Sequence, residues 1–185
     1  REDLAEQSID DLLDIARISG GKLELKKERA DLRGVLSSAI ETSLPLIETG
    51  RHELVVDMPE HAVPAEVDVT RIAQVVANLL NNAAKYTPAG GRIGLSLRIE
   101  GSHALIAVAD NGIGIPEDAL SSVFEMFSQV GHHLERAQGG LGIGLSLVRR
   151  LVDMHGGQVS ASSGGAHTGS TFTVRLPLAA PQPQP

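Results

Sequence analysis

The sequence has 185 residues, of which 42% are hydrophobic, with 16 Lys and Arg against 23 Asp and Glu and a formal net charge of -7. These values are typical of a folded globular chain of one domain or slightly more, and they exclude a disordered tail or a fibre. Cysteine and tryptophan are absent and aromatic residues make up 2%. The sequence therefore has no disulfide framework, no thiolate metal site and no stacking platform for bases, and its negative charge argues against nucleic acid as a partner.

No apolar run approaches the roughly 18 residues that a membrane-spanning helix needs, and the first residues lack the pattern of a signal peptide. The chain begins without methionine, inside an expected helix. We therefore expect a piece of a longer protein, located in the cytoplasm and without membrane contact of its own. The sequence leaves open whether the parent protein is anchored in the inner membrane.

Residues 1–20 are expected to form a helix with one apolar side. The apolar positions recur at i, i+3, i+4 and i+7, and they are Ile9, Leu12, Leu13 and Ala16. A single helix cannot bury such a stripe by itself, so we expect the end of a stalk that pairs with a helix outside this chain. A helix that lies on the following domain is the alternative.

Residues 21–178 are expected to form one α+β domain. Alternation predicts a strand at Lys22–Glu28 and another at His52–Val56. Between them, Asp31 is the expected cap of a helix that runs to about residue 49 and is bent or broken at Pro45.

The second half of the domain is expected to alternate between helices and hairpins. The pattern predicts a helix over residues 69–86, a hairpin of residues 92–99 and 103–109, a short helix near 117–123, a helix over 141–155 and a hairpin of 158–162 and 170–176. Strands in runs broken by helices favour a layered fold with a largely antiparallel sheet. The Pro- and Gln-rich end, residues 179–185, is expected to be disordered.

The expected helix over residues 69–86 has an unusual polar side. Apolar residues occupy one arc, and the opposite sector contains Arg71, Gln74, Asn78, Asn81, Asn82 and Lys85. A solvated helix surface usually carries Glu and Lys, whereas asparagine is a poor helix former. Amide oxygens can ligate Mg²⁺ and an ammonium group can meet phosphate. The helix alone leaves a metal and phosphate site and a solvated face as equal alternatives.

Two glycine-containing motifs have the chemistry of the rest of a nucleotide site. In residues 110–116, Asp110 follows a strand and can accept a hydrogen bond from the adenine amine, where guanine presents a carbonyl; a plain turn is the alternative. In residues 139–145, glycines begin a helix whose free N–H groups attract phosphate. This second spacing matches neither the P-loop nor the dinucleotide fingerprint, and a flexible hinge is the alternative.

Together the motifs resemble the catalytic and ATP-binding domain of sensor histidine kinases of two-component systems. Residues 78–87 resemble the N box of that family, 110–114 the first glycine box, 124–127 the F box, 140–145 the second glycine box and 169–172 the third. Residues 10–25 are similar to the end of the dimerisation helix and its exit. The resemblance implies a GHKL or Bergerat-type fold, a two-layer α/β sandwich whose mixed, mostly antiparallel sheet is covered by helices and preceded by a partial stalk helix.

The resemblance also implies the roles of individual residues, with ATP and Mg²⁺ as cofactors. Asn82 would ligate Mg²⁺, Asn78 would support the same ion and Lys85 would meet phosphate, and these three are the catalytic candidates. Among the other expected nucleotide-binding residues, Tyr86 would lie near the adenine or ribose and Ser170 near the base. Asp110 would accept from the adenine amine, with Gly112, Ile113, Gly114 and Ile115 beside it. Phe127 would precede a lid of residues 128–139, and the phosphates would lie at Gly140, Leu141, Gly142, Ile143, Gly144 and Leu145.

Two departures from the family pattern are present. Val69 stands where the family commonly has proline, which is harmless at the start of a helix. None of the seven histidines is followed by Glu/Asp-x-x-Thr/Asn-Pro, the phosphoacceptor pattern. The resemblance places that histidine on a stalk helix outside this chain. His132 and His133 are adjacent residues and form a poor metal pair.

Three classes of function follow. The first is a histidine kinase, a homodimer through its stalk, that transfers the γ-phosphoryl group of ATP to the stalk histidine for relay to an aspartate of a response-regulator receiver domain. The second is a GHKL-type ATP hydrolase, which is disfavoured because Asn78 stands where such enzymes have a basic Glu. The third is a regulatory module that binds nucleotide without transfer, which is disfavoured because Asn82, Lys85, Asp110 and the glycines are all present.

Overall fold

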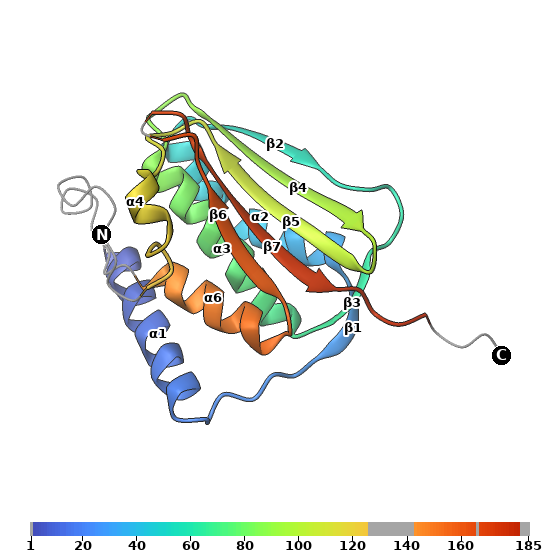
Figure 1. The fold of residues 1–185 in the computed structure, drawn as a ribbon. Helices are drawn as coiled ribbons and strands as arrows, with labels where there is room; N and C mark the ends of the chain where they lie inside the picture. Colours follow the sequence, from blue (N-terminus) through green and yellow to red (C-terminus); the bar gives the residue numbers. More distant parts are fainter. Residues whose placement is uncertain (1, 126–142, 166, 182–185) are drawn as a thin grey trace.

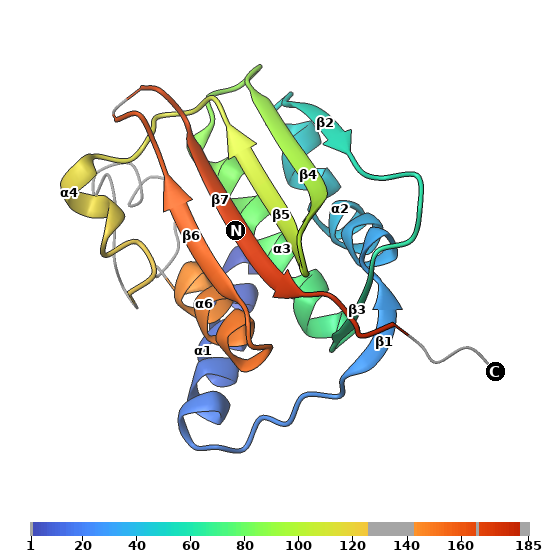
Figure 2. The same cartoon turned by 45° about the vertical axis from the view of Figure 1, so that its right-hand side comes forward.

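The computed structural model describes residues 2–125, 143–165 and 167–181. One five-stranded sheet faces a layer of helices (Figures 1 and 2). Its strands lie in the order β2 (Glu53–Asp57), β4 (Arg92–Glu100), β5 (His103–Asp110), β7 (Ser170–Pro177) and β6 (Gln158–Ser162). Only the β2–β4 pair is parallel within this sheet. The expected α+β sandwich with a mixed, mostly antiparallel sheet is confirmed.

The helix layer consists of α2 (Leu32–Thr49), α3 (Val69–Tyr86) and α6 (Gly144–Met154). Helix α3 packs against both of the others. Helix α1 (Glu2–Ser19) lies beside α6 at the outside of this layer, and the short helix α4 (Glu117–Leu120) follows β5 (Figure 1). Among the described residues, no helix combines the length and the apolar character needed to cross a membrane.

The hydrophobic core lies between the sheet and these helices. Strand β5 buries every second residue, Ala104, Ile106 and Val108, because alternate side chains of a strand point to opposite faces. Helix α3 buries the whole predicted apolar arc, which consists of Ile72, Val75, Val76, Leu79, Leu80 and Ala83. The alternating strands and the two-sided helix therefore meet along the faces that their patterns predicted.

The predicted strand at Lys22–Glu28 was wrong. The observed strand, β1 (Glu28–Asp31), begins where that segment ends and pairs antiparallel with β3 (Pro64–Val67), which the sequence pattern did not reveal. Strand β3 ends at Val67 because Asp68 is already the cap of α3. No partner residues remain there for the segment before Glu28, so its alternation produces no ladder.

One helix prediction also needs correction, and another is only partly tested. Helix α2 continues through Pro45 without a break. Residue Glu41, whose carbonyl loses its usual helical partner at Pro45, is exposed, so water can satisfy that carbonyl. The predicted start of the last helix, at residue 141, lies outside the described residues, and the described part of α6 begins at Gly144.

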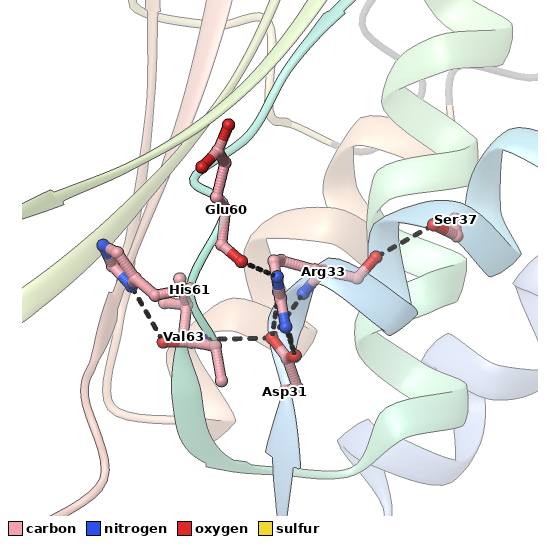
Figure 3. Close-up of polar contacts among 7 residues, drawn as sticks. Asp31, Arg33, Ser37, Glu60, His61 and Val63 are labelled. Carbon is pink, nitrogen blue, oxygen red and sulfur yellow. Dashed lines mark hydrogen bonds and ion pairs between the residues drawn. The ribbon is translucent and has the colours of Figure 1, made fainter.

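Asp31 joins three segments at the start of α2 (Figure 3). Its Oδ1 accepts hydrogen bonds from the backbone N–H groups of Arg33 at 3.1 Å and Val63 at 3.0 Å. The Arg33 guanidinium lies 2.8 Å from Asp31 Oδ2, donates to the Glu60 carbonyl and is the main cause of an Asp31 pKa lowered to about 2. The predicted cap is confirmed, and the same carboxylate connects α2 to the loop that leads into β3.

His155 connects the end of α6 to the start of α3. Its buried ring accepts a hydrogen bond at Nε2 from the Asp68 N–H at 3.1 Å, so Nδ1 carries the proton and donates to the Leu151 carbonyl at 2.7 Å. Burial lowers the pKa of His155. The Asp68 side chain accepts from the N–H groups of Arg71 and Lys26. A neutral imidazole thus fixes the cap residue of α3, and protonation would remove its acceptor.

His155 is expected to make the fold sensitive to acid. Since its folded-state pKa lies below the unfolded value of about 6.5, its contribution is present above that pH and is lost as the pH falls below it. The free-energy difference between wild type and His155→Gln should therefore shrink from pH 7.5 to pH 5, as measured by urea unfolding at each pH. At pH 7.5, His155→Leu should cost about 1–3 kcal/mol because it leaves the Asp68 N–H without an acceptor.

The matched control is His61→Gln, because His61 is exposed. This variant should leave the free energy of unfolding at pH 7.5 close to that of the wild type. A constant difference between wild type and His155→Gln over the whole range would contradict the neutral imidazole assigned here.

Candidate functional site

The polar side of α3 is divided into two parts. Near its start, Arg71 Nη1 lies 2.9 Å from Asp14 Oδ2 of α1, and Gln74 Nε2 donates to the same oxygen at 3.2 Å. Near its end, Asn78 is buried, and Asn82 and Lys85 are half-buried. The first two members of the predicted polar sector therefore support α1, and the later members are the candidate site.

Asn78 lies beside the start of α6. A Cβ built on Gly144 would lie 3.9 Å from Asn78 Nδ2, so the two residues are direct neighbours. The neighbouring Asn81 differs from a plain surface residue, since its Oδ1 is shielded from solvent and has no hydrogen-bond partner among the described residues. The structure thus brings the N-box helix and the last glycine of the second glycine motif together.

The last residue of α3 contacts the first glycine motif. The carbonyl of Tyr86 accepts a hydrogen bond from the Ile113 N–H at 3.2 Å. The Lys85 ammonium lies 5.2 Å from the centre of the Tyr86 ring, within the range of a cation–π interaction. Two segments that are separated by 27 positions are therefore fixed to one another through the main chain.

Asp110 ends β5, and protein donors already orient its carboxylate. Oδ1 accepts from the Gly112 N–H at 2.9 Å, and Oδ2 accepts from the Ser170 hydroxyl at 2.9 Å. Ser170 is the direct partner of Asp110 in the β5–β7 ladder. A carboxylate offers about four acceptor positions, so these two bonds leave capacity for a further donor such as an exocyclic amine.

The two glycines of the first motif are required by the protein's own backbone. A Cβ on Gly112 would overlap the Tyr86 carbonyl oxygen. Gly114 has φ +72°, and a Cβ there would overlap the carbonyl oxygen of Gly165. Loop packing therefore explains both glycines by itself, and their predicted place beside the adenine ring stays a prediction.

The second glycine motif is described only from Ile143 onward. The predicted nucleotide residues Gly140, Leu141 and Gly142, and Phe127 with the segment 128–139, lie outside the described residues. Ile143 and Ile115 are buried in the core, and Leu145 is half-buried. Within the described residues, no side chain caps the start of α6. Its first N–H groups can therefore donate hydrogen bonds to an anion.

The F-box and third glycine motifs meet at the edge of the core, where the half-buried Phe124 packs on the buried Phe172. The rings of Phe124 and Phe172 pack edge to face, with centroids 5.9 Å apart and an interplanar angle of 88°. Phe172 follows Ser170 on β7, so this contact lies on the strand that also orients Asp110.

Sequence reasoning missed two residues that shape the site. Asn111 Oδ1 accepts from the Arg92 N–H at 2.7 Å, which connects the first glycine motif to the start of β4. Ser163 Oγ accepts from the Ile115 N–H at 3.0 Å. No spacing pattern could have found Ser163, because its partner lies 48 positions earlier in the chain.

The donors of the site suit a nucleotide with a hard cation. Among the described residues, no group of three or more His, Asp and Glu side chains could hold a metal ion. Magnesium is usually bound by one or two protein oxygens together with phosphates and waters. The side-chain amides of Asn78 and Asn82 on α3 fit that description, with Gly144 at the start of α6 beside Asn78. The Asp110 carboxylate provides a separate acceptor for a base.

Comparison with known proteins agrees with this geometry. Residues 67–180 match the model of the family described as histidine kinase-, DNA gyrase B- and HSP90-like ATPase. The sensor histidine kinase TmoS of Ectopseudomonas mendocina is 37% identical over 180 residues, which cover 95% of this chain and 18% of TmoS. The adaptive-response sensory kinase SasA of Synechococcus sp. (strain JA-2-3B'a(2-13)) is 38% identical over 171 residues, covering 92% of this chain and 45% of SasA. The chain spans less than half the length of these relatives.

Solved structures show the same architecture. Full-length ShkA in complex with AMPPNP superposes with a TM-score of 0.80 and 28% identity, covering 96% of this chain and 36% of ShkA. The family match includes α3, strands β4 and β5 and all three glycine motifs. The chain therefore belongs to the family of histidine kinase-, DNA gyrase B- and HSP90-like ATPases, and it corresponds to the ATP-binding catalytic domain of sensor histidine kinases.

Proposed function

We propose that this chain binds ATP with Mg²⁺ and transfers the γ-phosphoryl group to a histidine on a dimerisation helix outside the chain. The phosphoryl group then passes to an aspartate of a response-regulator receiver domain, and the parent protein is a homodimer through its stalk. The observation that carries the proposal is that α3 contacts both glycine motifs, with Asn78 beside Gly144 and the Tyr86 carbonyl bonded to Ile113. A base at Asp110 and phosphates at α6 would both lie next to the second half of this helix.

The predicted site residues take the following roles in the proposal. Asp110 accepts a hydrogen bond from the adenine amine, and Ser170 keeps its carboxylate oriented. Tyr86 packs near the base or ribose, and the Lys85 ammonium moves from the Tyr86 ring to phosphate. The N–H groups at the start of α6 bind phosphate oxygens, together with the segment 140–142. That ShkA was solved with AMPPNP supports an adenine nucleotide as ligand.

Asn82 and Asn78 are the proposed magnesium residues. When bound, the ion would neutralise charge on the phosphates, and transfer of a phosphoryl group depends mainly on such neutralisation and on positioning. Asn82 presents its amide from the same side of α3 as the buried Asn78. The chain's own contribution is to place oxygen ligands, one ammonium group and helix N–H groups around one triphosphate.

Hydrolysis by this domain alone is disfavoured on the same geometry. The buried polar side chain on α3 beside the start of α6 is that of Asn78. An amide has no useful basicity toward water, whereas the hydrolases of the wider family place a glutamate at this position. The nucleophile must therefore come from another segment, which agrees with a histidine acceptor.

Asp110 is expected to select adenine over guanine. Asp110→Asn should weaken ADP binding by roughly tenfold or more, because the variant replaces one acceptor oxygen with a donor facing the adenine amine. Isothermal titration with ADP, ATP and GTP measures the change. Equal affinity of the wild type for ATP and GTP, or unchanged ADP affinity in the variant, would refute the role of Asp110.

Asn82 is expected to be more sensitive to added charge than its neighbour. Asn82→Asp should lower the affinity for Mg-ATP by roughly tenfold more than it lowers the affinity for ADP without metal. The reason is that the added negative charge changes the affinity for the metal ion and also repels the phosphates. Asn81→Asp is the matched control, with the same chemical change one position along α3. Titrations with and without Mg²⁺, compared at equal thermal stability, distinguish the two. Equal losses in both variants would show that the metal ligand is misassigned.

Transfer is expected to require the missing helix. Incubated with labelled ATP and Mg²⁺, this chain alone should retain no acid-labile phosphate and should hydrolyse ATP very slowly. Addition of a stalk hairpin that carries the acceptor histidine, as a separate chain, should give labelling on the hairpin only. Rapid hydrolysis by the chain alone would support the hydrolase alternative, and the absence of labelling after addition would support the binding module.

A further inference from the structure

The Ser163 hydroxyl lies at the base end of the proposed site. It bonds its own loop, between β6 and β7, and also the segment that follows Asp110. Ser163 follows β6 and precedes β7. Its Oγ accepts from the Ile115 N–H at 3.0 Å and from the Gly165 N–H at 3.2 Å. Its proton is donated to the Gly169 carbonyl at 2.7 Å, with the Gly165 carbonyl at 3.2 Å as a second acceptor. A hydroxyl has one donor and two acceptor positions, so Ser163 uses its full capacity on the main chain.

The two loops that Ser163 joins are also in direct backbone contact. The Gly169 N–H donates to the Gly112 carbonyl at 3.1 Å, and the His167 N–H donates to the Ile113 carbonyl at 2.6 Å. Gly169 has φ +77°, and a Cβ there would overlap the Asp110 carbonyl oxygen. Residues 163–165 and 167–169 therefore support the segment 110–115.

We infer that Ser163 is a positioning residue for adenine recognition, an inference that rests on the proposed ATP site. Its hydroxyl fixes Ile115 at one end of the first glycine motif and Gly169 at the other side of that motif. Gly169 directly precedes Ser170, whose hydroxyl bonds the Asp110 carboxylate at 2.9 Å. Ser163 thus acts through Ile115, Gly169 and Ser170 on the orientation of Asp110, without contact to the nucleotide itself.

The expected consequence of losing the hydroxyl is local. Ser163 is half-buried at the edge of the fold and is not part of the hydrophobic core. Its removal leaves the Ile115 N–H and the Gly169 carbonyl without their partner, while the β6–β7 ladder, which ends at Ser162 and Thr171, remains. The two loops would separate more easily, and Asp110 would lose its fixed orientation before the fold itself is lost.

The test compares Ser163→Ala with Ser163→Thr, which retains a hydroxyl, and with Ser162→Ala, an exposed neighbour on β6. Titration calorimetry of each variant with ADP and with GDP, and thermal unfolding without ligand, provide the readouts. Ser163→Ala should bind ADP roughly tenfold more weakly and should lose most of its preference for ADP over GDP. Ser163→Thr and Ser162→Ala should remain within about twofold of wild type.

The outcomes separate the inference from the proposed function. A wild-type chain that does not bind ADP would overturn the function, and the inference with it. Wild-type binding together with unchanged ADP affinity and preference in a folded Ser163→Ala would overturn the inference alone, as would a folded Ser163→Thr that fails to recover the preference. If Ser163→Ala does not fold, hydrogen exchange of the wild-type backbone amides is measured with and without ADP. ADP should slow the exchange of the Ile115 and Gly165 N–H groups, which donate to Ser163. Unchanged exchange would overturn the inference.

Discussion

The orientation of α3 about its own axis is the constraint on which the rest of the site depends. Every residue of its apolar arc, from Ile72 to Ala83, is 0–2% exposed. Full burial of one such aliphatic side chain contributes about 1.5–3 kcal/mol, so a rotation that exposed several of them would cost a large part of the roughly 5–15 kcal/mol by which a typical domain is stable. The core therefore determines the direction of the asparagines and Lys85. Asn78 lies beside the start of α6, and Arg71 and Gln74 lie beside α1, because no other rotation keeps the opposite arc out of water.

The elements that could be predicted are those whose pattern is long and local. The bounds of α3 and the β4–β5 hairpin follow from residues that are close in sequence and from periodicities repeated over many positions. The small β1–β3 sheet could not be predicted, because its strands have four residues each and Glu28 pairs with Val67, 39 positions away. The residues of Lys22–Glu28 do alternate, but a strand also needs a partner strand. Strand β3 cannot extend to pair with them, because Asp68, the residue after it, caps α3.

The candidate site shows the same division between residue types and their surroundings. The motif spacing predicted Asp110, Asn78 and Gly144, and the structure brings Asn78 and Gly144 together. The same spacing did not reveal why the glycines are needed. A Cβ on Gly114 would overlap the backbone of Gly165. The glycine that the motif assigned to ligand space is therefore also required by the contact between two protein segments. Contacts of this kind join positions that are far apart in sequence, and their donors and acceptors are main-chain atoms that every sequence contains.

Helix α1 lies on the domain, as the alternative interpretation of its sequence expected, and its pairing with an outside helix stays a prediction. It packs on the domain through Ile15 and the buried carboxylates of Asp11 and Asp14, while the predicted stripe remains outside, with Ile9 57%, Leu12 40% and Leu13 49% exposed. Burial, with the Asp14 carboxylate as the next cause, raises the pKa of Asp11 to about 6, so this side of the helix is a costly one to bury. The Asp14–Arg71 pair and Gln74 offset that cost. The apolar stripe is thereby left accessible to the paired helix that the hairpin interpretation expects. Through Asp14, α1 contacts Arg71 and Gln74 on the same helix that carries Asn78 and Asn82, the proposed magnesium residues.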